Sequence, residues 1–161
     1  METKTFSVVT NYKHTQFSYL MLVVTLAVFV FFAWIHITGS AEPDSTDSGP
    51  NFAITFLMAL ILFILASLVS LQVIIDGKYL RIKFSFGIYQ KKFSLNDIMS
   101  AKTVKNHWHY GWGIRRWLWP KMWIYNVSGF DAVEIKLKNG KTYRIGTDEP
   151  EKLEQILQSI K

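Results

Sequence analysis

The stretch Phe17–Thr38 reads FSYLMLVVTLAVFVFFAWIHIT and contains no Asp, Glu, Lys or Arg. It lies inside a longer uncharged stretch, residues 15–41, and a second uncharged stretch covers residues 48–75. The hydrocarbon core of a bilayer is about 30 Å thick, so a helix needs roughly 20 apolar residues to cross it. The sequence therefore predicts a hairpin of two transmembrane helices, at residues 17–38 and 52–71.

Both predicted helices lack charged residues, Gly and Pro. Intramembrane charges mark ion pathways and interrupted helices mark transporter sites, so we expect no transport through this hairpin alone. One alternative concerns Gly39-Ser40-Ala41, which resembles a signal-peptidase site. The apolar region before it is longer than a typical signal core, and the intact hairpin is the preferred interpretation. The mass of the purified protein would distinguish the two, because cleavage removes residues 1–41.

Charge is distributed unevenly along the chain. The part after residue 75 holds 16 of the 18 Lys and Arg residues but 8 of the 12 acidic ones, a net charge of +8. The connection at residues 39–51 holds three acidic residues and no basic one. Basic segments stay on the cytoplasmic side of a membrane. We therefore expect residues 1–16 and 72–161 in the cytoplasm and residues 39–51 outside.

The cytoplasmic part alternates apolar and polar residues, which indicates strands with one buried face. Two dipeptides, Asp76-Gly77 and Asn139-Gly140, mark tight turns, and Asn-Gly is the strongest short signal for a hairpin. The predicted strands cover residues 72–75, 79–84, 88–95, 98–104, 131–138 and 143–145.

The chain is predicted to close with a helix at residues 149–160. Asp148 is the expected N-cap, and Glu151 follows three residues later in a capping-box arrangement. The apolar residues at helical spacing are Leu153, Ile156, Leu157 and Ile160. The predicted fold is a small all-β domain, a partly open barrel or curled antiparallel sheet of six or seven strands, which this C-terminal α-helix caps.

Two apolar helices followed by a short β domain resemble bacterial membrane proteins with a pleckstrin-homology-like (PH-like) domain. The stretches that carry the resemblance are Val73–Gly77, Tyr110–Arg115, Tyr125–Gly129 and Tyr143–Pro150. The resemblance covers about residues 71–161. It implies a partly open barrel and an address in the bacterial inner membrane. It offers no catalytic residues and no cofactor, and a fold alone does not define a function.

The densest chemical signal is a set of aromatic and basic residues between residues 108 and 123, where five of the six tryptophans fall. A Trp ring combines a large apolar face with one N–H donor and suits the membrane–water boundary. Lys and Arg beside it are attracted to anionic headgroups. We expect a lipid- or partner-facing patch, with packing inside the domain as the alternative. Its members are Trp108, Trp112, Arg115, Arg116, Trp117, Trp119, Lys121 and Trp123.

Two smaller sets carry less information. Lys78, Arg81 and Lys83 lie on the first hairpin of the domain and are headgroup candidates, although a solvated strand face is the preferred interpretation. His107 and His109 form an H-x-H pair, but the chain lacks cysteine and a zinc site needs three or four ligands. We therefore expect no metal site. No nucleophile–base pair, phosphate loop or carboxylate dyad is recognisable in the sequence.

These patterns predict a non-enzymatic module that binds or scaffolds at the cytoplasmic membrane surface, with the bilayer and its anionic headgroups as partners. The alternative is an oligomerising subunit or accessory protein of a larger membrane complex. Nucleic acid is not expected as a partner, because orientation and an anionic membrane surface account for the positive charge. No cofactor is expected.

Overall fold

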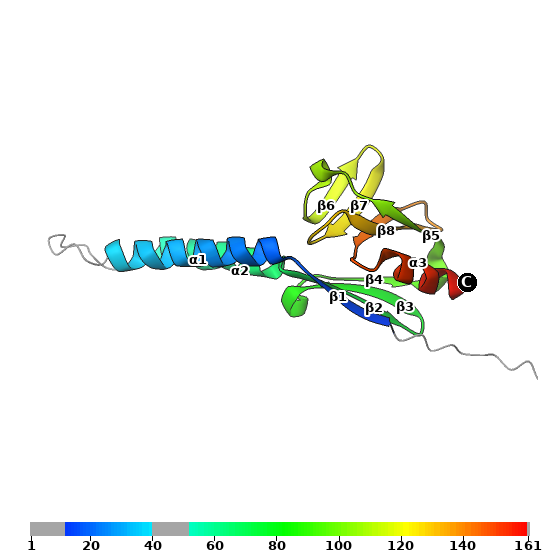
Figure 1. Ribbon diagram of the computed structural model, residues 1–161, viewed down its shortest axis with the longest axis horizontal. Helices are drawn as coiled ribbons and strands as arrows, with labels where there is room; N and C mark the ends of the chain where they lie inside the picture. The colour runs from blue at the N-terminus through cyan, green and yellow to red at the C-terminus, as the bar shows by residue number, and fades with distance from the viewer. Residues whose placement is uncertain (1–11, 40–51, 161) are drawn as a thin grey trace, which may run out of the picture.

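The computed structural model describes residues 12–39 and 52–160 (Figure 1). Most of the predicted external loop and most of the N-terminal segment lie outside the described residues. The helices are α1 (Tyr19–Gly39), α2 (Phe52–Ser67) and α3 (Pro150–Ser159), with short 3-10 turns η1 (Ser85–Gly87), η2 (Leu95–Asp97) and η3 (Trp108–Tyr110). The strands are β1 (Tyr12–Phe17), β2 (Ser70–Asp76), β3 (Tyr79–Phe84), β4 (Gln90–Ser94), β5 (Ile98–Lys105), β6 (Gly113–Leu118), β7 (Lys121–Asn126), β8 (Asp131–Leu137) and β9 (Thr142–Gly146).

Helices α1 and α2 form an extended pair that projects from the β domain (Figure 1). Within the described residues, α1 is the one helix long and apolar enough to cross a membrane, and none of its span at Tyr19–Thr38 is buried. Helix α2 is equally apolar but has 16 residues, a length of about 24 Å at 1.5 Å per residue. It ends earlier than predicted because the chain turns into β2 at Ser70.

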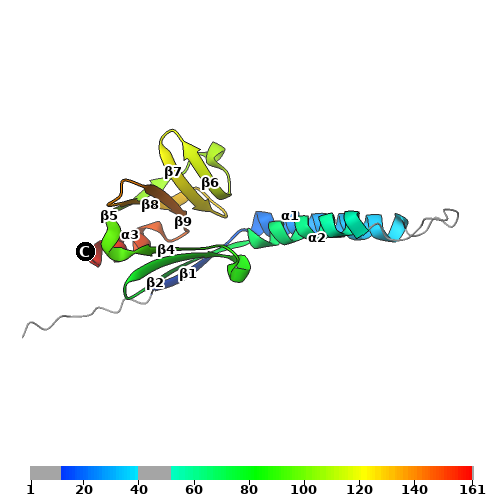
Figure 2. The ribbon, with the colours of Figure 1, turned by 180° about the vertical axis from the view of Figure 1, so that it is seen from behind.

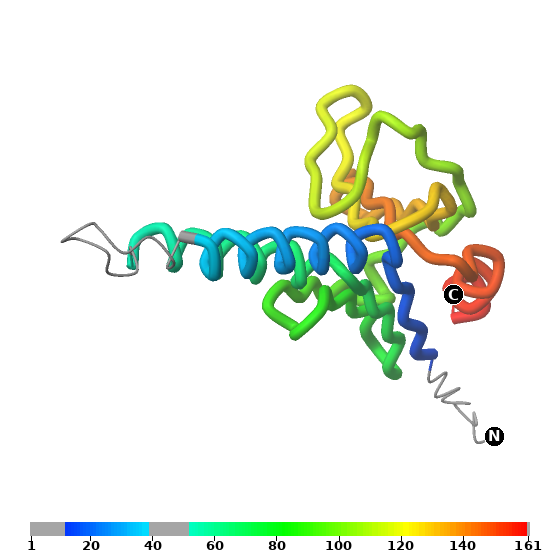
Figure 3. Tube along the Cα trace, turned by 60° about the vertical axis from the view of Figure 1, so that its left-hand side comes forward, coloured from blue at the N-terminus to red at the C-terminus, as the bar shows by residue number. Residues whose placement is uncertain are grey.

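Along the chain, the two helices lie between β1 and β2, and these two strands pair with each other. Strands β1 and β2 are antiparallel over six residue pairs, from Tyr12 opposite Ile75 to Phe17 opposite Ser70. The pairing continues to the base of the helices, where the Ser18 amide donates to the Val69 carbonyl at 2.8 Å. Both strands therefore leave the same end of the helix pair (Figure 3).

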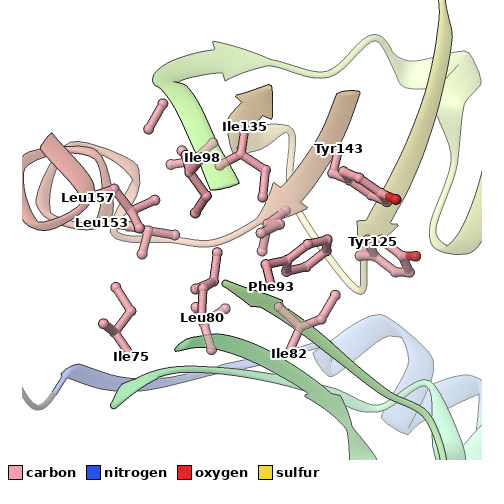
Figure 4. Packing of buried hydrophobic residues seen from close by; sticks show 14 of the residues in the cluster. Ile75, Leu80, Ile82, Phe93, Ile98, Tyr125, Ile135, Tyr143, Leu153 and Leu157 are labelled. Carbon is pink, nitrogen blue, oxygen red and sulfur yellow. The ribbon is translucent and has the colours of Figure 1, made fainter. Parts of the chain in front are cut away.

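Two sheets enclose the core. The first is antiparallel in the order β1-β2-β3-β4, and the second has the order β5-β8-β9-β7-β6. Phe93 of β4 meets Tyr143 of β9 edge-on across the gap, with ring centroids 4.8 Å apart. Leu153 and Leu157 of α3 complete the same core (Figure 4). Other core residues are Leu71, Val73, Ile75, Leu80, Ile82, Ile98, Tyr125, Ile135 and Ile145.

The domain differs from the predicted single curled sheet of six or seven strands. The described residues form nine strands in two sheets, and they do not close into a barrel. Strands β1, β6 and β7 were not predicted. Strand β9 lies between β8 and β7, antiparallel to β8 and parallel to β7. The prediction of a wholly antiparallel sheet was therefore wrong at this one pair.

The predicted cap of the C-terminal helix was also wrong. The N-cap of α3 is Glu149, and it makes no side-chain capping bond. Asp148 instead contacts the His14 imidazole of β1. A tertiary hydrogen bond has thus replaced the local cap. The helix is tied to the second sheet at its other face, where the Glu154 carboxylate accepts a hydrogen bond from the Thr103 amide at 2.7 Å. Hydrogen bonding from Thr103 lowers the pKa of Glu154.

Strand β1 is also held against the start of α3. Tyr12 is buried, and its hydroxyl donates to Glu149 Oε2 at 3.4 Å. Burial, followed by the charge of Glu149, raises the pKa of Tyr12 from 10.0 to about 12. Ionising this phenol would place an anion in the core beside a carboxylate, so β1 is held most firmly while Tyr12 is neutral.

Tyr12→Phe tests this contact through its pH dependence. The folded-state pKa of Tyr12 lies above the unfolded value, so its contribution to stability is complete below about pH 10 and is lost as the pH rises toward 12. We expect the wild-type unfolding temperature in detergent to fall more steeply than that of Tyr12→Phe between these values. Circular dichroism melts of both proteins give the comparison. Parallel pH profiles would contradict the buried environment of this phenol.

Candidate functional site

The predicted aromatic patch falls on η3 and on the β6–β7 hairpin. Gly111, which follows η3, has a φ of 64°, a left-handed conformation that favours glycine. The reversal at Gly111 lets η3 lie against the hairpin. In the hairpin, Arg116 pairs with Trp123 and Trp117 pairs with Met122. Aromatic residues are common in strands because they pack well on a pleated surface.

The five tryptophans differ in exposure and in the part of the domain that they pack against. Trp108 on η3 is 81% exposed, and Trp119 in the turn of the hairpin is 86% exposed. Trp112, Trp117 and Trp123 are half-buried. The exposed pair and the half-buried three therefore have different environments, and the two exposed rings lie on different elements.

Trp117 helps to form a second, smaller core on the outer face of the hairpin. Its ring lies 4.9 Å from the Tyr110 ring and 5.5 Å from the His109 ring, measured between centroids. Tyr110 packs there with Met122 and Ile124, both buried. The Trp117 indole N–H donates to the Trp119 carbonyl at 2.7 Å. These contacts fix η3 and the turn of the hairpin relative to each other.

Trp123 faces the main core instead. Its ring is stacked with that of Tyr125 at 6.5 Å, and the Arg116 guanidinium lies 6.0 Å from its centroid. The Tyr125 hydroxyl lies 3.1 Å from the Tyr89 hydroxyl. Burial and this hydrogen bond raise the pKa of Tyr125. Trp123 thus belongs to an aromatic layer that joins the two sheets.

The start of β6 lies close to the base of the helices. A methyl group built at Gly113 would lie 3.9 Å from Leu68 Cδ2. The loop after β7 reaches the same place, because Ser128 Oγ donates to the Phe17 carbonyl at 3.1 Å. Figure 2 shows η3 on the side of the hairpin that faces the helices. Trp108 belongs to η3 and is exposed.

The basic members of the predicted patch are exposed. Arg115 donates from Nε to the Trp112 carbonyl at 3.1 Å. Arg116, Lys121 and Lys141 line a hollow of about 230 Å³ between the β6–β7 hairpin and the β8–β9 turn. No described carboxylate lies within ion-pair distance of these three side chains. Unpaired cations in one hollow raise the local positive potential.

The second predicted set is spread along the first sheet. Lys78 lies in the β2–β3 turn, at the end of the sheet away from the helices. Arg81 forms an ion pair with Asp76 at 2.9 Å. Lys83 lies nearer the helices, opposite Gln72 and Gln90. The three side chains do not converge on one hollow.

His107 and His109 are exposed and stack on each other with ring centroids 5.2 Å apart. In residues 12–39 and 52–160, no group of three or more His, Cys, Asp and Glu side chains is arranged to hold a metal ion. His36 on α1 contacts Thr55 of α2 at 3.0 Å, a polar contact between the two helices.

Two exposed aromatic residues at the base of the helices were not among the predicted site residues. Phe17 is 56% exposed and Phe86 is 76% exposed. The available signal was the absence of charge between Phe84 and Gln90, a loop between two strands that carry lysines.

Comparison with protein-family models finds no match, and comparison with curated proteins finds no matching relative.

Trp117→Ala and Trp119→Ala separate the packed ring from the exposed one. We expect Trp117→Ala to lower the free energy of unfolding by about 2 kcal/mol, because it removes half-buried aromatic contacts. Trp119→Ala removes an exposed ring and should change it by less than about 0.5 kcal/mol. Urea unfolding in detergent, followed by circular dichroism, measures both. Equal losses would contradict the division of the aromatic segment into packed and exposed parts.

Proposed function

We propose that the chain is a membrane-anchored module in which α1 and α2 cross the bacterial inner membrane and a PH-like β domain lies at its cytoplasmic surface. The observation that carries this proposal is the β1–β2 pairing, which sends both apolar helices out of one end of the domain. Their side chains are largely exposed, including Leu26, Phe29 and Phe63. A large exposed apolar surface requires an apolar environment.

The length of α2 is compatible with crossing. Its described helix is short, but the uncharged sequence begins at Ser48, before the helix, and continues to Ile75. Bilayers thin locally around short helices at modest cost. The +8 charge after residue 75 supports a cytoplasmic β domain.

The N-terminal strand supports an intact hairpin over a cleaved signal. Cleavage after Ala41 would remove β1, including the buried residues Tyr12 and Gln16. It would also expose the edge of β2, whose residues from Leu71 to Ile75 alternate into the core. An exposed apolar edge strand promotes aggregation. The stable fold therefore includes β1, which favours a chain that is not cleaved after Ala41.

The proposed role of the domain is binding or scaffolding at the membrane surface rather than catalysis. Trp108 would lie at the headgroup level, where Trp rings are favoured. The unpaired cations Arg116, Lys121 and Lys141 would add attraction to anionic lipids. The PH-like part of the proposal rests on the sequence resemblance, and the domain has two packed sheets whose core α3 completes.

Cysteine labelling tests the topology, because the natural chain has no cysteine. We expect Asn139→Cys, in the exposed β8–β9 turn, to react with an impermeant maleimide only after the cells are permeabilised. Ser45→Cys should react in intact cells. Labelling of Asn139→Cys in intact cells would overturn the cytoplasmic placement of the domain.

Quenching by brominated lipids tests the role of Trp108 in proteoliposomes. We expect part of the tryptophan quenching to disappear in Trp108→Phe and to persist in Trp119→Phe, the matched exposed control. The Trp108 contribution should grow with the fraction of anionic lipid. Quenching equal to wild type in Trp108→Phe would contradict headgroup contact. A defined oligomer in mild detergent, independent of lipid charge, would instead favour an assembling subunit.

A further inference from the structure

The loop between β3 and β4 has an unusual backbone. Phe86, at its tip, has a φ of 58° and is the one residue other than glycine with a positive φ in the described chain. This left-handed conformation is unfavourable for a bulky side chain. Backbone strain of this kind persists only where surrounding contacts impose it, and it is concentrated at functional positions.

Hydrogen bonds hold the loop in place. Ser85 Oγ accepts from the Ser70 amide at 2.8 Å and lies 3.0 Å from the Ser70 hydroxyl. On the other side, Gln90 Nε2 donates to the Gly87 carbonyl at 3.0 Å. Helix α2 ends at Ser67, and Ser70 is the first residue of β2. The loop is therefore fastened to the chain just after it leaves α2.

The loop presents apolar side chains at this place. Phe86 is 76% exposed and Ile88 is 57% exposed. With Leu26 and Phe29 of α1 and Phe63 of α2, Phe86 lines a groove of about 630 Å³ that is almost entirely apolar. The groove continues the outer surface of the helices, and α1 has none of its span buried.

We propose that Phe86 inserts among the lipid acyl chains of the cytoplasmic leaflet, as a second membrane contact of the β domain. The inference rests on the proposed membrane anchoring and extends it from the helices to the first sheet. Lipid is the expected occupant, because the groove is continuous with the surface that α1 and α2 present to the bilayer. Residues 84–90 carry no charge that would oppose entry.

The opposite end of the same sheet has the contrasting composition. Strand β2 ends at Asp76, and the β2–β3 turn contains the exposed Lys78. The sheet therefore presents an uncharged aromatic loop toward the helices and a charged turn away from them. In Figure 1, η1 and η3 lie on opposite sides of the helix axis. Contacts at Phe86 and Trp108 would together fix the tilt of the domain.

Single-cysteine variants of the full chain in proteoliposomes test the insertion. Phe86→Cys and Ile88→Cys report on the loop, Lys78→Cys on the far turn, and Val30→Cys, at an exposed position of α1, on the helix. Each carries an environment-sensitive fluorophore. We expect the labels at residues 30, 86 and 88 to be quenched by brominated acyl chains and several-fold less by aqueous iodide than the label at residue 78.

The outcomes separate the two proposals. If the label at residue 30 is in lipid while those at residues 86 and 88 are quenched by iodide, the insertion is overturned and the membrane anchor stands. If the label at residue 30 is also quenched by iodide, the anchor itself is overturned. Protection of residue 86 from both quenchers would mean that protein covers the loop, which also overturns lipid insertion.

Discussion

The pairing of β1 with β2 is the constraint on which the rest of the structure depends. The two strands are distant in sequence, with both apolar helices between them, yet they match over six residue pairs. The helix pair and the sheet therefore share a continuous backbone on two strands. The junctions between helices and strands are short, and rotation of the helices relative to the sheet would break the hydrogen bond from the Ser18 amide to the Val69 carbonyl. The orientation of the β domain relative to the helices is thus fixed by the fold.

The elements with strong local patterns were predictable from the sequence. Strand β3 has the predicted bounds, and Asn139-Gly140 forms the turn between β8 and β9. Strand β1 was missed because Gln16, a polar residue, occupies a buried position, which breaks the apolar alternation. Asp148 was assigned to a local cap because its partner, His14, lies 134 residues away in the sequence. Both failures come from tertiary contacts that no local pattern records.

The aromatic segment shows the same limit for the candidate site. Successive side chains of a strand point to opposite faces, so Met122 and Trp123 enter different cores. Strand β7 is covered on both faces, by the main core and by the cluster around Tyr110. Its sequence is accordingly apolar without alternation, like a buried strand of any kind. Composition alone could identify the segment as important, but the division into packed and exposed rings follows from η3 folding against the hairpin.

The second sheet is tied to the base of the helices by polar contacts as well as by Leu68, which packs against the main core. Gln16 Nε2 donates to the Ser128 carbonyl at 3.1 Å, and Ser128 Oγ donates to the Phe17 carbonyl at 3.1 Å. Gln16 and Phe17 of β1 are thus both hydrogen-bonded to Ser128, in the loop that follows β7. Two oxygen atoms at this place, Gln16 Oε1 and Asn126 Oδ1, are buried without a protein partner. Burying such an atom lowers the stability of the fold unless water reaches it. Apolar contacts could slide, whereas directional hydrogen bonds specify one position. The junction therefore holds both sheets in one defined position relative to the helices.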